Sequence, residues 1–211
     1  MSYPPAWRID HSDAAPQLMR EHPFAHLFTA HSVLGATRIP FVTDIEDGAP
    51  FRLRGHLNAQ NPQAEGLDGA DVLIVFSGYS TYVSPNWRIE PTRGGTYDYE
   101  EVRVRGAARI RTDIQYFRKL IDDLSALIEP QYAEVGDYPV WNTSIAPEGY
   151  VERLFPMVAS FEIKIDSVEM ISKLHQQFPD ADRKSIADHL SRSKREGARA
   201  IAEKIRKSIQ A

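Results

Sequence analysis

The chain has 211 residues, of which 42% are apolar and 26% are charged, which is ordinary for a globular protein with a sizeable core. It contains no cysteine, and this excludes disulfide scaffolds, thiol catalysis and cysteine-ligated metal centres. No apolar run approaches the roughly 18 residues of a membrane span, and the N-terminus lacks the order of a signal peptide. We therefore expect a cytoplasmic protein that does not contact a membrane.

The net charge of −4 is unevenly distributed along the chain. Residues 182–211 hold nine basic and four acidic side chains, so this segment is positive and the remainder is negative. The simplest interpretation is a solvated helix face, and the alternative is a surface for DNA phosphates or a protein partner. We expect residues 1–190 to form one domain and residues 191–211 to form a basic helical extension.

The first third of the chain begins with a predicted helix, which starts at Asp13, has Pro16 in its first turn and ends near Pro23. Extended segments follow, separated by turns that contain Gly35 and Gly48. The strands expected in this part of the chain are 24–31, 36–44 and 51–57.

Alternating and continuous apolar patterns predict more strands in the middle of the chain. Val102 and Val104 alternate with Arg103 and Arg105, and Gly106 permits a bend or bulge after them. The strands expected here are 70–76, 80–83 and 97–111.

A strong helical pattern then begins at Thr112 or Asp113 and ends at Pro130, with apolar residues at spacings of three and four. Because strands and helices do not alternate along the chain, we predict a mainly antiparallel, closed or split β-barrel with peripheral helices. The remaining expected elements are a short helix at 147–155, a strand at 161–166, and helices towards the C-terminus that are interrupted at 191–197.

Two polar loops, residues 55–63 and 77–87, flank the predicted buried strand 72–76. Loops at both ends of one strand are a natural way to hold a polar ligand on a sheet. In the second loop, Trp87 can stack on a planar ring or pack in the core, and Ser84 can donate a hydrogen bond to a phosphate or carbonyl.

The first of these loops combines a histidine with several amides. Gly55 permits a close approach of backbone or ligand beside His56. Asn58 and Asn61 are good hydrogen-bond partners for a ligand, although an asparagine before a proline is also ordinary turn chemistry.

Thr37 and Arg38, on the predicted strand 36–44, form a candidate phosphate-binding pair. The planar guanidinium binds two oxygens at once, and the neighbouring hydroxyl can add a third contact. The alternative is an ordinary surface arginine on a strand.

The order of these motifs resembles one family, the PaiB-type FMN-binding negative transcriptional regulators, over most of the chain up to about Leu190. The resemblance implies an FMN-binding split barrel that forms a homodimer, with the cofactor at the subunit interface. In that arrangement the phosphate is held by Arg38, His56 and Lys173, and the ring packs against Trp87 and Tyr97. The implied cofactor-binding residues are Thr37, Arg38, His56, Asn58, Asn61, Ser84, Trp87, Tyr97, Lys173 and Gln176.

Several positions depart from the pattern of that family. Arg88 stands where the family has tyrosine, and Arg38 stands where it has histidine. Tyr97 and Asp98 replace a tryptophan and an asparagine, and His175 replaces a serine. The charge of an aspartate at this point would disfavour an anionic flavin nearby.

Other functions remain open at this level. The chain has no dinucleotide-binding glycine motif, P-loop, zinc-protease motif or nucleophile elbow, so it identifies no catalytic residue and no metal site. A flavin-dependent oxidoreductase is compatible with this, because the hydride chemistry would belong to the flavin. Related split barrels bind or degrade haem, for which His56, His175 or a tail histidine is a candidate axial ligand. The last alternative is a split barrel that has lost its flavin.

Overall fold

The computed structural model describes residue 7 and residues 14–30, 34–91 and 93–210. Seven strands form one sheet in the order β2-β1-β5-β6-β7-β4-β3. The strands are β1 (Phe24–Thr29), β2 (Gly35–Pro40), β3 (Val42–Glu46), β4 (Ala49–Asn58), β5 (Asp71–Val83), β6 (Thr96–Arg111) and β7 (Val158–Lys173). The α-helices in the described ranges are α1 (Ala14–Glu21), α2 (Ile114–Ile128), α3 (Tyr150–Leu154), α4 (Asp180–Ser191) and α5 (Glu196–Gln210).

The prediction of a mainly antiparallel β protein with peripheral helices is confirmed by the strand pairing. β1 pairs antiparallel with β2 and with β5, and β4 pairs antiparallel with β3 and with β7. No helix in the described part of the chain is long and apolar enough to cross a membrane. The predicted helix start at Asp13 lies outside the described residues.

Three strands differ from the prediction. The strand predicted at 36–44 is divided into β2 and β3 at Phe41, whose ring is fully buried and whose N–H donates to Pro23 O at 2.9 Å. The two segments predicted at 70–76 and 80–83 form the single strand β5, because the polar residues between them continue the ladder instead of turning. β7 is likewise much longer than the predicted 161–166.

The chain divides into two compact units. The hairpin unit contains Ser77–Val102 and the chain from Glu169 onward, together with Trp7, and the sheet unit contains residues 14–76 and Arg103–Val168. The boundary between them falls within the sequences of β5, β6 and β7.

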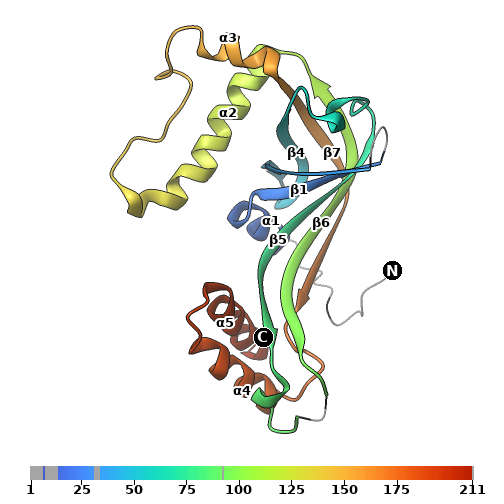
Figure 1. The fold of residues 1–211 in the computed structure, drawn as a ribbon, viewed down its shortest axis with the longest axis vertical. Helices are drawn as coiled ribbons and strands as arrows, with labels where there is room; N and C mark the ends of the chain where they lie inside the picture. The colour runs from blue at the N-terminus through green and yellow to red at the C-terminus, as the bar shows by residue number, and fades with distance from the viewer. Residues whose placement is uncertain (1–6, 8–13, 31–33, 92, 211) are drawn as a thin grey trace. The chain divides into compact units, whose positions relative to one another are not determined.

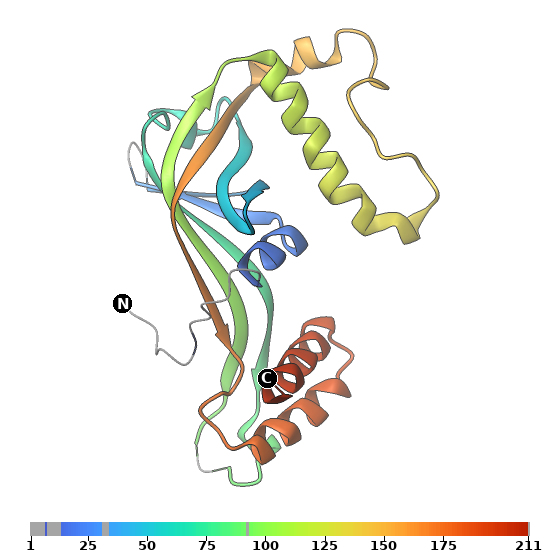
Figure 2. The same ribbon diagram turned by 180° about the vertical axis from the view of Figure 1, so that it is seen from behind.

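The sheet unit is built around buried aromatic rings. Phe41 lies 5.9 Å from Phe76 and 6.2 Å from Phe161, measured between ring centroids. α2 begins as predicted at Asp113, whose carboxylate accepts from Gln115 N at 2.8 Å, and it buries Phe117 and two leucines. Figure 2 shows the long excursion from the end of α2 to α3.

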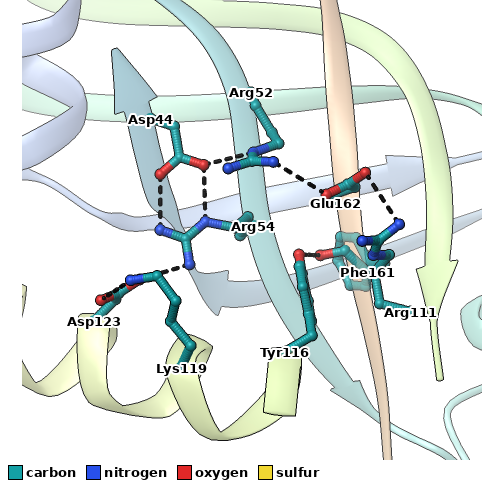
Figure 3. A network of polar contacts seen from close by, with 9 residues as sticks. All are labelled: Asp44, Arg52, Arg54, Arg111, Tyr116, Lys119, Asp123, Phe161 and Glu162. Carbon is teal, nitrogen blue, oxygen red and sulfur yellow. Dashed lines mark hydrogen bonds and ion pairs between the residues drawn. The ribbon is translucent and has the colours of Figure 1, made fainter. Parts of the chain in front are cut away.

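A charged network joins β3, β4 and α2 in the same unit (Figure 3). Arg54 is buried and donates to both carboxylate oxygens of Asp44, at 2.7 and 2.8 Å, and to Asp123 at 2.7 Å. Arg52 adds a 2.6 Å bond to Asp44 and lies 3.6 Å from Glu162 on β7. Burial raises the pKa of Asp44, but the hydrogen bonds and charges of the two arginines outweigh it, so the net pKa lies below its ordinary value.

The hairpin unit has its own hydrophobic core, formed mainly by α4 and α5, which lie side by side in red in Figure 1. Ile186 and Leu190 on α4 pack with Ile201 and Ile205 on α5, and Val83 at the end of β5 joins them. The basic C-terminal segment is therefore a core-forming helix with a charged outer side. The domain boundary at residue 190 stays a prediction.

Candidate functional site

An open cleft of about 860 Å³ lies in the hairpin unit, between the end of β5, the start of β6 and the α4–α5 turn. Its aromatic wall contains two predicted ligand residues, Trp87 and Tyr97. The ring centroids of Tyr97 and Tyr82 lie 5.8 Å apart, with an interplanar angle of 68°. Trp87 lies nearly parallel to His189, with a centroid distance of 5.9 Å and an interplanar angle of 9°. The cleft is lined by Ser80, Thr81, Tyr82, Trp87, Tyr97, His189, Leu190, Arg192, Ser193, Arg195, Gly197 and Ala198.

Two arginines also line the cleft. Arg192 and Arg195 lie on the turn between α4 and α5, and both are exposed. Within the described residues, neither takes part in an ion pair. A cleft lined by aromatic rings and unpaired guanidinium groups suits a planar ring compound that carries a negative charge.

Sequence reasoning missed His189, Arg192 and Arg195 as site residues. The excess of basic residues after position 182 was the signal for them, but it gave no indication that the α4–α5 turn and Trp87 line the same cleft. That proximity depends on the packing of the two helices against the end of β5.

Three departures from the family pattern meet in one buried cluster beside this wall. His175 Nδ1 lies 2.6 Å from Asp98 Oδ2, and both side chains are fully buried. Arg88 Nη2 lies 3.3 Å from His175 Nε2. Because arginine has no acceptor, we assign His175 as the neutral tautomer that accepts from Arg88 and donates to Asp98.

Arg88 also holds the loop that follows Trp87. Its guanidinium donates to the carbonyl oxygens of Arg93 at 3.2 Å and Gly94 at 3.3 Å, and lies 4.3 Å from the ring centroid of Phe178. The cluster therefore fixes the residues next to both aromatic side chains of the cleft, Arg88 after Trp87 and Asp98 after Tyr97.

Lys173, predicted to hold a phosphate, is buried beside the same cluster. Its ammonium donates to Thr96 Oγ1 and to Tyr97 O, each at 2.5 Å, and lies 5.3 Å from the ring centroid of Trp7. Burial lowers the pKa of Lys173, and the charge of Asp98 opposes this shift. Its donors are thus used to anchor the start of β6.

Two more predicted residues of the hairpin unit make local turn contacts. Ser84 Oγ accepts from Asn86 N at 3.3 Å. Gln176 accepts from Leu174 N at 2.7 Å and donates to Ser172 O at 2.5 Å.

The other five predicted residues lie in the sheet unit. Asn61 donates to Thr37 Oγ1 at 2.9 Å, and the Thr37 hydroxyl donates to Gln63. Asn61 Oδ1 also accepts from Gln63 N at 2.9 Å, and Asn58 Oδ1 accepts from Gln60 N at 2.8 Å. The structure therefore brings Thr37 and Asn61 together, in a chain of bonds that shapes the loop after β4.

Arg38 lies on the surface, whereas His56 packs against an aromatic side chain. Arg38 is exposed and lies over the ring of Phe24 at 4.6 Å, with Nε donating to Phe24 O at 3.1 Å. His56 packs edge-on against Phe117 at 6.0 Å, and burial lowers the pKa of its imidazole. At Gly55 the side chain of Phe41 lies 3.2 Å from where a Cβ would stand, and the expected approach of backbone or ligand there stays a prediction.

Solved structures share this fold. The structure of the FAD and heme binding protein from Mycobacterium smegmatis has a TM-score of 0.53 and 14% identity, over 84% of this chain and 75% of that one. The flavocytochrome Anf3 from Azotobacter vinelandii also has a TM-score of 0.53, with 15% identity over 79% of this chain and 69% of that one. At such low identity these likenesses define the fold alone, which is a split β-barrel.

The chain belongs to the family described as "Putative FMN-binding domain", which matches residues 1–167. It is 28% identical to an uncharacterized protein of Emericella nidulans over 90% of each chain. It is 24% identical to the protease synthase and sporulation protein PAI 2 of Bacillus subtilis, over 99% of this chain and 100% of that one. The predicted PaiB-type relationship is thereby confirmed.

Proposed function

We propose that the protein is a flavoprotein that binds FMN, with the ring against Trp87 and Tyr97 in the cleft of the hairpin unit. The observation that carries this proposal is the cleft itself, which is lined by aromatic side chains and by unpaired arginines. FMN presents the complementary groups, a planar ring and a phosphate. Membership of an FMN-binding family supports the same ligand.

The chain's own residues would hold and orient this cofactor. Tyr97 and Trp87 would exclude water from one side of the ring, and the buried bonds of Arg88 and Asp98 would keep these aromatic side chains in place. The flavin would supply any hydride chemistry. The roles predicted for Thr37, Arg38, His56, Asn58, Asn61, Ser84, Lys173 and Gln176 stay predictions.

An absorption spectrum of the freshly purified protein tests the proposal. We expect flavin bands, and mass spectrometry of the released compound should identify FMN and separate it from FAD. Trp87→Ala should weaken FMN binding, while Trp141→Ala, in the other unit, should leave it unchanged. A protein that is colourless and stays so after incubation with FMN contradicts the proposal.

Haem is the rival ligand, and the same spectrum would reveal it through a strong Soret band. The structure argues against His175 as its axial ligand, because both ring nitrogens already have protein partners. His56 is also a poor candidate for the axial ligand, because its ring packs against Phe117 and its Nδ1 is buried.

We also propose a homodimer. Phe24 and Phe28 alternate on one face of β1 and are 49% and 37% exposed, and Leu34 is 93% exposed. Large apolar side chains gathered on an open sheet face are typical of a contact with another chain.

A regulatory role in the cytoplasm is a further proposal, supported by the PaiB-type relationship and by the basic C-terminal segment. Specific DNA should then be retained by the protein, with an affinity that falls steeply as salt is raised. Retention that does not change with salt, or no retention, contradicts a phosphate-mediated contact.

A further inference from the structure

We propose that the turn between α4 and α5 is the anion-binding part of the aromatic cleft, where Arg192 and Arg195 bind the phosphate of a ring-containing phosphomonoester. FMN is the ligand of this class that the proposed function names, and the inference rests on that function. The turn lies beyond residues 1–167, so the family match assigns it no role.

The first observation is uncompensated charge at this turn. Arg192, Lys194, Arg195 and Arg199 are all exposed, and none forms an ion pair within the described ranges. Arg199 donates only to Ser193 O, at 3.0 Å. The acid of the turn is Glu196, which accepts from the Tyr79 hydroxyl at 2.8 Å.

Three cations of the two helices outside the turn are paired, whereas Lys184 and Lys207 are exposed and form no ion pair within the described ranges. Arg183 pairs with Asp180 at 3.1 Å, and Arg206 pairs with Asp188 at 2.9 Å. Lys204 pairs with the buried Glu100 at 2.5 Å. The two turn arginines are distinguished by their place in the lining of the cleft, which Lys184 and Lys207 do not share.

The second observation is that the two turn arginines share their cleft with a built aromatic wall. Trp87 stacks on the parallel ring of His189, whose Nδ1–H donates to Ser185 O at 2.8 Å. A ligand that reaches both walls therefore combines a planar ring with an anionic group.

The size of the cleft favours a small molecule over a nucleic acid strand. Its volume of about 860 Å³ falls within the roughly 300–1,000 Å³ of small-molecule sites. Binding a single strand needs a charged groove that follows the backbone over about four or more nucleotides. Here the arginines that line the cleft, Arg192 and Arg195, both lie on one turn.

Lys173, which the sequence predicts to hold the phosphate, donates to protein groups in the structure. Its ammonium bonds to the Thr96 hydroxyl and to the backbone oxygen of Tyr97. Its side chain is buried, whereas Arg192 and Arg195 are exposed in the cleft.

Comparing FMN with riboflavin isolates the phosphate contact, since the two differ only in that group. We expect flavin-free wild-type protein to bind FMN more tightly than riboflavin. Arg192→Ala/Arg195→Ala should weaken FMN binding by roughly 10-fold to 100-fold, as expected for losing charge-assisted hydrogen bonds, and should leave riboflavin binding unchanged. Lys184→Ala/Lys207→Ala removes two exposed charges outside the cleft and should change neither affinity.

The other possible results separate a failure of the phosphate assignment from a failure of the proposed FMN binding. If the arginine variant loses FMN and riboflavin affinity equally, or loses neither, the phosphate is not bound at this turn, although the flavin function stands. If wild-type protein binds neither FMN nor riboflavin, the proposed function is contradicted, and the phosphate assignment that rests on it is contradicted as well. If the two arginines are needed to retain a short single-stranded oligonucleotide while FMN shows no preference over riboflavin, the turn binds nucleic acid and the proposal is overturned.

Discussion

Arg88, Asp98 and His175 are unrelated departures from the family pattern in the sequence, but their side chains form one hydrogen-bonded cluster in the structure. A lone buried aspartate would carry an uncompensated charge beside the cleft. With His175 at 2.6 Å and Arg88 behind it, that charge is balanced inside the protein. The predicted repulsion between Asp98 and an anionic flavin is therefore reduced by residues that replaced the family's serine and tyrosine.

A double-mutant cycle on this pair tests the compensation. His175→Ser removes the partner of a fully buried carboxylate and should lower the free energy of unfolding by about 3–5 kcal/mol. Asp98→Asn/His175→Ser restores the family's residues at both positions and should be more stable than His175→Ser alone. Urea denaturation measures all four proteins, and strictly additive effects would show that the two side chains are not coupled.

At the same scale, the sequence identified the aromatic residues of the cleft better than its polar ones. A local turn cannot cover rings as large as those of Trp87 and Tyr97, so these side chains must pack against another part of the protein or against a ligand. Asn58, Asn61 and Gln176 have the same amide group whether they bind a ligand or a neighbouring backbone atom, and the structure shows them making protein contacts. Local sequence does not distinguish these two uses.

Among the elements, β6 is constrained by its neighbour β7 at Gly106. A Cβ built at Gly106 would stand 2.1 Å from Lys164 O, which is backbone and has little freedom to move. The bend or bulge predicted at Gly106 stays a prediction, and the structure shows instead a close approach of β7 to this glycine.

Gly106→Ala should therefore destabilise the protein by about 1–3 kcal/mol, as overpacking usually does. Gly94→Ala is the matched control, because a Cβ at Gly94 has no atom within 4 Å. Thermal or urea unfolding compares the two variants. Equal stabilities would mean that the strands separate to accept the methyl group at little cost.

The network that joins β3, β4 and α2 should make stability depend on acid. The folded-state pKa of Asp44 lies below its unfolded value, so its contribution is fully present above the unfolded pKa and is lost as pH falls through the folded one. Asp44→Asn should be clearly less stable than wild type at pH 7, and the difference should shrink below about pH 4.

Urea denaturation at several pH values measures this difference. Asp47→Asn is the control, since Asp47 is exposed in the turn between β3 and β4 and has no ion pair within the described residues. A gap between wild type and Asp44→Asn that stays constant from pH 7 to pH 3 would contradict the assignment.

For the whole molecule, the class of fold followed from the sequence because alternating patterns and the lack of strand–helix alternation are local signals. Strand lengths did not follow. Polar residues around Gly78 read as a loop, yet they lie within β5, where pairing with neighbouring strands outweighs local preference. The order of strands in the sheet also depends on contacts that no local pattern records.

The proposed homodimer gives a prediction at this scale. Phe28→Glu places a charge on the exposed apolar face of β1 and should convert a dimer into a monomer, as measured by light scattering after size-exclusion chromatography. Phe51→Glu changes another exposed phenylalanine, 42% accessible on β4, and should leave the dimer intact. A monomeric wild-type protein would contradict the proposal.

The cleft has one wall within the family's matched residues and another, on α4 and α5, that follows them. Mutations in the part of the cleft formed by α4 and α5 leave the family-matched residues 1–167 unchanged. Homologous proteins could therefore diverge in the anionic group they accept while keeping the same ring-binding aromatic residues. Ligand preference in this family would then be inherited separately from the barrel, and would be lost or exchanged by changes in a single helical turn.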